Sequence, residues 1–181
     1  AYHRALASKC KQHPIAIVNI GGVANVTWIG SDGDLVAFDT GPGNALIDDW
    51  IKKHTGASRD EGGKLGLLGQ VDEASVAQFL GDSFFEQSVP KSLDRNTFAG
   101  YSLGGLNVAD GAATLVAVTA RSIALSSRHM PEQPKSWIIC GGGRHNKAIM
   151  RALELVLNHA QSAEQINLDG DAIEAEAWAF L

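Results

Sequence analysis

The chain has 181 residues, of which 45% are hydrophobic and 19% are charged, and its formal net charge is −5. That length fits one domain, or at most two small ones, with a hydrophobic core large enough to be stable without disulfides or a structural metal. Duplex-binding proteins displace counterions with a concentrated basic surface, and no Lys/Arg cluster occurs here, so we expect no nucleic-acid partner. Two distant cysteines, Cys10 and Cys140, without a CxxC or HxxxH pair, argue against a zinc site or disulfide framework and favour the cytoplasm.

The sequence predicts neither a membrane span nor a secretory signal. It contains no uninterrupted run of about 18 apolar residues and no basic leader followed by an apolar segment. The chain starts at Ala1 and stops at Leu181 on the apolar residues of a predicted helix, whereas termini are usually polar tails. We therefore expect a fragment of a longer protein.

The predicted elements alternate between glycine-bounded strands and helices with a 3.6-residue period. In chain order, strands are predicted at residues 15–20, 23–29, 35–38 and 136–140, and the first three form a β-meander. Helices are predicted at residues 44–54, 73–80, 110–128, 146–159 and 171–181. Residues 60–69 and 88–105 are predicted loops, the second long enough to be a functional candidate. The late strand–turn–helix unit implies a mixed sheet with packed helices, so the predicted fold class is α/β.

The string NIGGVAN, residues 19–25, places Gly21 and Gly22 between the first two predicted strands. A glycine turn lets the backbone approach a ligand closely, and its N–H groups can bind phosphate oxygens. A plain hairpin turn explains the same residues, and this segment by itself favours that simpler interpretation.

The string FDTGPGN, residues 38–44, puts Asp39 at a strand end, directly before a glycine-rich turn and a helix. Ligands of α/β proteins bind outside the carboxyl ends of strands, so Asp39 is a candidate for accepting a proton from a bound hydroxyl or water. The helix start near Asn44 offers N–H groups to an anion. The alternative is that Asp39 accepts a hydrogen bond from the N–H of Gly41 or Gly43, but the density of special residues favours a functional role.

Gly141, Gly142 and Gly143 join a predicted strand to a helix and remove every side chain from the path of a flat base or ribose. A dinucleotide-binding turn would have glycine where Asn146 stands, and its acidic residue would be Glu164, which is predicted to lie in a polar loop. The triplet therefore favours a nucleotide of some kind over a dinucleotide. A glycine turn packed tightly against a helix is the alternative.

Several charged residues are weaker candidates. Asp171 and Glu174 have the spacing of a helix capping box, so Glu174 is either a cap or a ligand for a polar substrate. Arg121 and the loop 91–95 are candidates for contacting phosphate or sugar, although such residues more often form local salt bridges. His145 stands out among the histidines only because it lies beside the glycine triplet.

Together these segments resemble the anhydro-N-acetylmuramic acid kinases. The matching strings, in order, are NIGGVANV, FDTGPGN with the following DDW, PKSLDRNTF, TLVAVTARSIA, CGGGRHN and DGDAIEAEAWAFL. The likeness covers nearly the whole chain, and although each motif is modestly specific, their common order is strongly so. It implies the two-lobed, ribonuclease H-like fold of the sugar kinase/Hsp70/actin superfamily, and residues 1–181 resemble the C-terminal lobe.

The resemblance implies an enzyme that uses ATP, Mg²⁺ and water to convert 1,6-anhydro-N-acetylmuramic acid to N-acetylmuramic acid 6-phosphate, in cytoplasmic cell-wall recycling. It makes Asp39 the general base that activates the water. The other residues that it implicates are Gly21, Gly22 and Asn25 in a phosphate motif, Gly141, Gly142, Gly143 and Asn146 in an adenosine motif, and Gly41, Gly43, Asn44 and Glu174 near the sugar.

The family's N-terminal lobe carries a phosphate motif of the G-T-S-x-D-G kind, and no such string occurs here. We therefore expect this chain alone not to be a competent kinase. Three alternatives stay open: a non-catalytic nucleotide-binding module of the actin/Hsp70 type, another sugar kinase of the superfamily, and a dinucleotide-binding reductase. The oligomeric state and the metal ligands are open as well, with a homodimer among the options.

Overall fold

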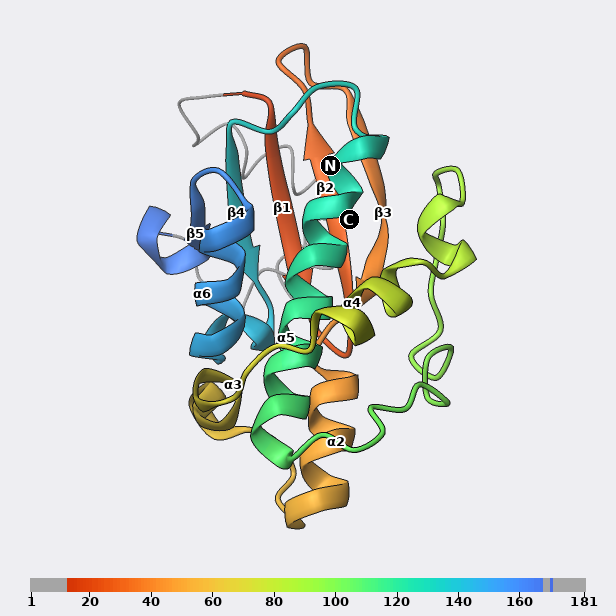
Figure 1. Ribbon diagram of the computed structural model, residues 1–181. Helices are drawn as coiled ribbons and strands as arrows, with labels where there is room; N and C mark the ends of the chain where they lie inside the picture. Colours follow the sequence, from red (N-terminus) through yellow and green to blue (C-terminus); the bar gives the residue numbers. More distant parts are fainter. Residues whose placement is uncertain (1–12, 168–169, 171–181) are drawn as a thin grey trace.

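The computed structural model describes residues 13–167 and residue 170, and its centre is a five-stranded sheet (Figure 1). The strands are β1 (Ile15–Ile20), β2 (Val23–Ile29), β3 (Leu35–Pro42), β4 (Ser136–Cys140) and β5 (Ala160–Ser162), in the spatial order β3-β2-β1-β4-β5. β1, β2 and β3 pair antiparallel as the predicted meander, whereas β4 is parallel to β1 and β5 is parallel to β4. The mixed α/β class is confirmed.

The strand directions bring several chain segments to one edge of the sheet. Because β3 and β1 are both antiparallel to β2, the strands β1, β3, β4 and β5 all end at the same edge. The chain leaves β1 toward β2 on one side and leaves β4 toward β5 on the other, so the strand order reverses between β1 and β4. Open α/β sheets bind ligands at such a reversal, outside the carboxyl ends of the strands.

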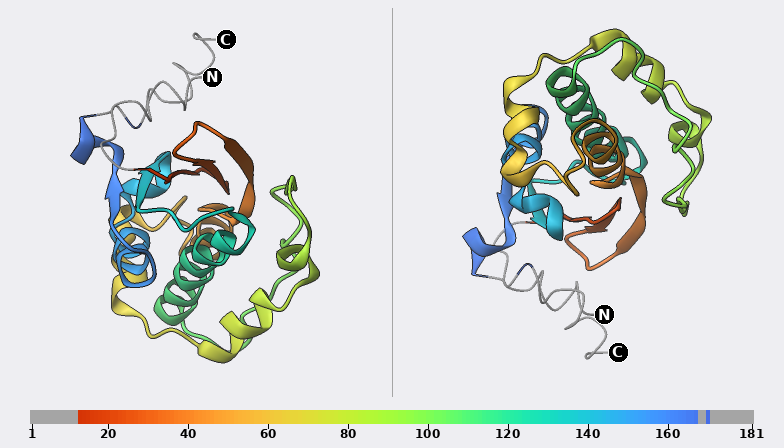
Figure 2. Two further views of the ribbon diagram at one scale, coloured as in Figure 1. Left: turned by 90° about the horizontal axis from the view of Figure 1, so that it is seen from above. Right: turned by 90° about the horizontal axis from the view of Figure 1, so that it is seen from below.

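Helices fill the connections between the strands. The α-helices are α2 (Ala45–Thr55), α3 (Lys64–Leu68), α4 (Glu73–Leu80), α5 (Val108–Leu125) and α6 (Lys147–Val156). The short 3₁₀ helices are η1 (Glu61–Gly63), η2 (Ser83–Glu86), η3 (Ser126–His129), η4 (Gly142–His145) and η5 (Ala163–Ile166). Figure 2 shows that the segment from α4 to the start of α5 arches around the outside of α5.

α5 is the core helix of the domain. Asn107 caps its start by accepting a hydrogen bond from the N–H of Asp110, and 12 of its 18 residues are buried. With η3 it is long and apolar enough to cross a membrane, but 67% of the apolar window is buried in the domain, as in the core helix of a globular domain. Gly111 admits the Trp50 ring of α2, since a Cβ on Gly111 would lie 2.1 Å from Trp50 Cζ2.

Alternation along the strands separates two faces of the sheet. Ala16, Val18 and Ile20 of β1 belong to the main core, which they share with α5. Ile15 and Ile17 of the same strand belong to a smaller cluster on the opposite face. Because successive side chains of a strand point to opposite faces, the next residue in the second series, Asn19, also lies on the face away from α5.

Two of the predicted element boundaries, the end of the third strand and the end of the helix after residue 146, are wrong. The strand expected at 35–38 continues to Pro42, because Gly41 and Pro42 still pair with Ala24 and Val23 of β2. The helix expected at 146–159 ends at Val156, since the chain then turns into β5. β5 was not predicted because its three residues include no β-branched or aromatic side chain.

The loop expected at 60–69 is also wrong in part, because it contains η1 and α3. The carboxylate of Asp60 accepts hydrogen bonds from the N–H groups of Leu65 and Gly66, at 3.0 and 2.9 Å, and so satisfies the first turn of α3. The loop expected at 88–105 is confirmed, since it forms turns and contains no helix or strand. The helix expected at 171–181 lies outside the described residues.

Candidate active site

Two glycine corners meet at the carboxyl edge of β1 and β4. Asn19 of β1 pairs with Cys140 of β4 in a parallel register, so the turn at Gly21 and Gly22 emerges beside the turn that starts at Gly141. In the sequence these corners are separate motifs that lie more than 100 residues apart. The parallel pairing of β1 and β4 makes them neighbours at the point where the strand order reverses.

The three glycines of the second corner have different surroundings. Gly141 has a φ of 75°, and a Cβ there would lie 2.1 Å from Asn19 Oδ1. A Cβ on Gly143 would lie 2.3 Å from Ile20 Cγ2. Gly142 faces open space and is exposed. Gly141 and Gly143 therefore let the corner pack against the end of β1, and Gly142 is the member that faces solvent.

The first corner is held by the start of α2. The N–H groups of Gly43 and Asn44 donate to the carbonyl oxygens of Gly22 and Gly21 at 2.9 and 2.8 Å. The Asn44 amide Nδ2 donates to the carbonyls of Ile20 and Gly21 at 3.3 and 3.2 Å. A Cβ on Gly43 would lie 2.3 Å from the Gly21 oxygen, so this contact requires glycine. Gly43 and Asn44 thus fix the shape of the turn that was predicted to hold phosphate.

Asp39 lies at the same edge, in a row of polar residues that crosses three strands. Asn25 of β2 pairs with Asp39 on one side and with Asn19 on the other, so all three side chains share the face away from α5. Two strand spacings separate Asp39 from Asn19, which is roughly 10 Å. Because Asn19 touches the position of a Gly141 Cβ, the row leads from the carboxylate to the second glycine corner.

The hydrogen-bond partner of Asp39 differs from the one considered from sequence. Its Oδ2 accepts from the N–H of Leu93 at 2.7 Å, and its own N–H donates to the carbonyl of Lys91 at 3.0 Å. Neither Gly41 nor Gly43 supplies this bond. Gly41 instead faces α5, where a Cβ would lie 2.7 Å from Ser122 Oγ. The loop 91–95 therefore orients the half-buried Asp39 carboxylate.

A hollow of about 500 Å³ opens beside the second corner. It is lined by Asn44, Asp48, Arg59, Asp60, Glu61, Gly62, Gly142, His145 and Asn146. Burial, followed by the charge of Asp49, raises the pKa of Asp48 above its ordinary value, while Arg59 and Arg95 act in the opposite direction. Asn44, Gly142 and Asn146 come together in this lining, whereas Asp39 lies outside it.

Asn146 and Arg144 stabilise the second glycine corner through hydrogen bonds. Asn146 Oδ1 caps α6 by accepting from the N–H groups of Ala148 and Ile149 at 3.0 and 3.2 Å. The Arg144 side chain is 3% exposed and donates to Glu164 Oε1 at 2.7 Å and to the Gly141 carbonyl at 2.8 Å. Sequence reasoning missed Arg144, and the available signal was the acidic Glu164 twenty residues later.

The loop 91–95 is anchored at both ends. Lys91 Nζ donates to the carbonyl of Phe84 at 2.9 Å and lies 4.4 Å from the centre of the Phe84 ring. Burial lowers the pKa of Lys91 below its ordinary value. Arg95 Nη2 pairs with Asp49 Oδ1 at 3.2 Å, and a Cβ on Gly22 would lie 3.7 Å from Arg95 Cδ. One loop therefore contacts both Asp39 and the first glycine corner.

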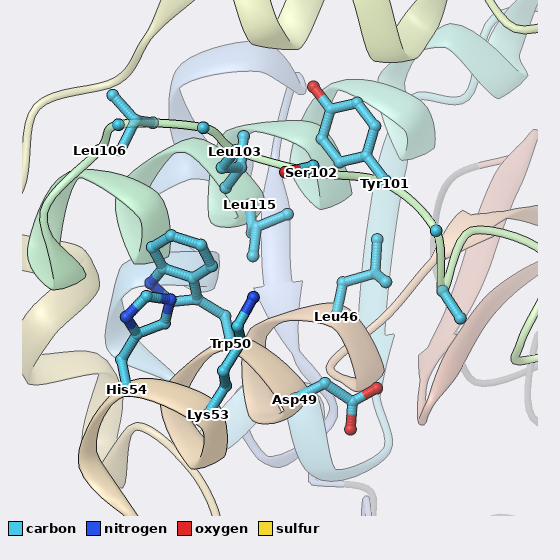
Figure 3. Close-up of a pocket in the computed structure, with 14 residues that line it drawn as sticks. Leu46, Asp49, Trp50, Lys53, His54, Tyr101, Ser102, Leu103, Leu106 and Leu115 are labelled. Atoms are coloured by element: carbon cyan, nitrogen blue, oxygen red, sulfur yellow. The ribbon is translucent and has the colours of Figure 1, made fainter.

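A second hollow, of about 450 Å³, lies between α2 and the loop 99–106 (Figure 3). Trp50 and His54 form one wall with ring centroids 4.0 Å apart, and Trp50 Nε1 donates to the Val108 carbonyl at 2.9 Å. Leu103, Leu106 and Leu115 line the opposite side. Asp49 and Trp50 of the DDW string line this hollow, but none of the site residues proposed from sequence does.

The remaining candidates divide into two groups. Arg121 forms an ion pair with Glu73, which is the local role considered for it from sequence. Asp171 and Glu174 lie outside the described residues. Within residues 13–167 and residue 170, no three His, Cys, Asp or Glu side chains come together as a metal site.

Comparisons with known proteins identify the family of the chain. The family model described as anhydro-N-acetylmuramic acid kinase matches residues 1–181. Curated relatives with that name are 52% identical in Rhodospirillum rubrum and 47% identical in Zymomonas mobilis subsp. mobilis. The matches cover 100% and 99% of this chain but 48% and 50% of the relatives, so the chain spans about half the length of the curated relatives it matches.

Two solved structures share the fold at low sequence identity. The (R)-2-hydroxyglutaryl-CoA dehydratase component A of Acidaminococcus fermentans matches with a TM-score of 0.57 and 18% identity. The activator of the 2-hydroxyisocaproyl-CoA dehydratase from Clostridium difficile matches with a TM-score of 0.55 and 15% identity. Each match covers 99% of this chain and 68% of the other. These likenesses agree with the predicted fold class, a mixed sheet with packed helices.

Proposed function

The chain belongs to the anhydro-N-acetylmuramic acid kinase family, and from that premise we propose that the protein that contains it converts 1,6-anhydro-N-acetylmuramic acid, ATP and water to N-acetylmuramic acid 6-phosphate and ADP. The reaction takes place in the cytoplasm and recycles cell-wall sugar. The observation that carries the proposal is that Asp39 and the two glycine corners, at Gly21 and Gly141, lie at the same edge of the sheet.

Asp39 acts as the general base in this proposal. Leu93 holds one carboxylate oxygen, and the other takes a proton from the water that attacks the anomeric carbon. A bond forms between the water oxygen and the anomeric carbon as the bond from that carbon to O6 breaks. O6 then takes the γ-phosphoryl group, and ADP leaves. A carboxylate at a strand end suits this chemistry because the strand and the loop 91–95 fix its direction.

The glycine corners bind the nucleotide in this proposal. Gly22, the exposed residue of the first corner, presents backbone to the phosphates, and Gly142 presents an open surface to adenosine beside the 500 Å³ hollow. One structural relative, the Clostridium difficile activator, was solved with bound ADPNP. Gly41, Gly43 and Asn44, which the resemblance places near the sugar, shape this edge of the sheet by their contacts with Ser122 and Gly21.

Mg²⁺ accompanies ATP in this proposal. The described residues offer it no cage of three ligands, and Mg²⁺ in kinases is usually bound by one or two carboxylates together with substrate phosphates. When bound, the ion neutralises charge on the phosphates during transfer. Asp39 is assigned the proton-transfer role alone.

The test of the proposed function is an assay of the full-length protein with 1,6-anhydro-N-acetylmuramic acid and ATP, in which ADP release is followed with and without the sugar. Sugar-dependent ADP release supports a sugar kinase, and release without sugar dependence would contradict it. The same assay on residues 1–181 should show no turnover, because the G-T-S-x-D-G motif is absent from them. Turnover equal to that of the full-length protein would overturn that expectation.

A further inference from the structure

Arg95 lies on the open side of the turn that we assign to the phosphates. A Cβ on Gly22 would lie 3.7 Å from Arg95 Cδ and 3.8 Å from Arg95 Nε, so the guanidinium stem rests on the exposed glycine. Gly22 is exposed, while the carbonyl oxygens of Gly21 and Gly22 are engaged by the start of α2. A ligand that meets this turn from solvent therefore meets Arg95 as well.

The present partner of Arg95 holds it weakly. The guanidinium Nη2 is 3.2 Å from Asp49 Oδ1, and the two side chains are 56% and 59% exposed. Exposed pairs of this kind contribute little to stability, because water competes for both charges. Exchanging the Asp49 carboxylate for a more highly charged phosphate therefore costs the fold little. Arginine suits phosphate because its planar fork of N–H groups can bind two oxygens at once.

Arg95 also shares a short loop with the groups that orient Asp39. Leu93 donates its N–H to the Asp39 carboxylate, and Lys91 accepts the N–H of Asp39 through its carbonyl. Asp94 is the one residue between Leu93 and Arg95. A ligand bound by Arg95 would therefore contact the same loop that orients the Asp39 carboxylate.

We propose that Arg95 is a phosphate-binding residue of the kinase site, which exchanges Asp49 for the terminal phosphate of ATP. The inference rests on the proposed function, because it needs ATP at the first glycine corner. It adds a cation that neutralises charge on the transferred phosphoryl group, a contribution that phosphoryl transfer requires. It also predicts that nucleotide phosphates and the orientation of Asp39 are linked through the loop 91–95.

The experiment measures binding of adenosine, ADP and the non-hydrolysable analogue ADPNP to full-length protein by calorimetry. In the R95Q variant we expect the Kd of ADPNP to rise about 10- to 100-fold, the loss typical of a hydrogen bond to a charged group, with adenosine binding unchanged. R95K should lie between R95Q and wild type, since it keeps the charge but not the fork. R121Q, which removes an arginine from the Glu73 pair, should bind as wild type does.

The outcomes separate this inference from the proposed function. If R95Q binds ADPNP as tightly as wild type, Arg95 does not bind phosphate and the inference fails while the kinase proposal stands. If R95Q weakens adenosine as much as ADPNP, Arg95 acts by packing, and the inference also fails. If the wild-type protein prefers ADPNP no more than adenosine, the proposed function fails and the inference falls with it. A thermal melt of R95Q and R95K checks folding, and a folded R95K suffices for the comparison.

Discussion

The N–H of Leu93 donates a 2.7 Å hydrogen bond to the Asp39 carboxylate, although the two residues lie 54 positions apart in the chain. A second bond, from the N–H of Asp39 to the carbonyl of Lys91 at 3.0 Å, makes the loop 91–95 run beside the end of β3 like an extra strand segment. The direction of the carboxylate is therefore set by a loop and not by the glycine turn that follows it.

The D39N variant tests the role of that carboxylate. Asparagine keeps an oxygen for the Leu93 N–H and the size of the side chain, but it cannot take a proton at neutral pH. We expect kcat of the full-length enzyme to fall about 10²- to 10⁴-fold, the usual contribution of a general base, with ATP binding unchanged. Steady-state kinetics and calorimetric titration provide the two measurements.

A matched control for D39N is D34N, which makes the same change at an exposed turn residue. D34N should keep the wild-type kcat. A D39N enzyme that also turns over at the wild-type rate would show that Asp39 is not the general base.

Alanine substitutions at neighbouring positions of the glycine triplet should affect different properties, stability at Gly141 and adenosine binding at Gly142. G141A places a Cβ 2.1 Å from Asn19 Oδ1 at a φ of 75°, so it should destabilise the fold by about 1–3 kcal/mol. G142A meets open space and should leave the melting temperature unchanged. Because Gly142 lines the 500 Å³ hollow, G142A should instead weaken adenosine binding. Thermal melts and adenosine titrations distinguish the two, and equal loss of stability in both variants would contradict this assignment.

The hydroxyl of Thr119 links the core helix to the site. It donates to the Gly43 carbonyl at 3.0 Å in a buried position, so T119V leaves that carbonyl without its donor. We expect T119V to lower the free energy of unfolding by about 1–3 kcal/mol, the cost of an unsatisfied buried polar group. T55V is the matched control, since Thr55 lies at the exposed end of α2 and should cost less than about 0.5 kcal/mol. Urea denaturation measures both, and equal losses would contradict the prediction.

The Arg144–Glu164 pair predicts a pH dependence of stability. Burial raises the pKa of Glu164, but hydrogen bonds from Arg144 and its other neighbours outweigh it and bring the value to about 2, below the ordinary 4.5. A lowered pKa stabilises the fold above the ordinary value, and this contribution is lost as pH falls from 4.5 toward 2. Since the Glu164 carboxylate is half exposed, we expect E164Q to cost only about 1 kcal/mol at neutral pH.

Urea denaturation of wild type and E164Q across pH 7 to 2 checks this prediction. The difference between the two proteins should be constant near neutral pH and should shrink below pH 4.5. A difference that stays the same down to pH 2 would show that Glu164 acts only by packing.

The sequence was sufficient to predict elements whose signals are local. The apolar alternation of β1 and the amphipathic period of α2 depend on neighbouring residues, and both elements lie where they were expected. α3 and β5 were missed because their short segments carry weak propensity, and the contacts that stabilise them are distant in sequence. Asp60 is a local signal for the start of α3, since its carboxylate accepts hydrogen bonds from the N–H groups of Leu65 and Gly66.

The candidate site was predicted in its parts but not in its assembly. Asp39 and the glycines were recognisable because glycine and aspartate at strand ends are unusual locally. Their convergence depends on the parallel register of Asn19 with Cys140, which no local pattern reveals. The contacts of Asp39 with Leu93, and of Arg95 with the Gly22 turn, were hidden for the same reason, because loop 91–95 has no periodicity to place it.

The most direct test of the account is the mass of the sugar product formed by the full-length enzyme in water labelled with ¹⁸O. If Asp39 activates water for attack on the anomeric carbon, the product gains one phosphoryl group and one labelled water, with the label on the anomeric hydroxyl. A product that carries the phosphoryl group with its anhydro ring intact and no label would contradict the account, and would instead indicate simple transfer to a free hydroxyl.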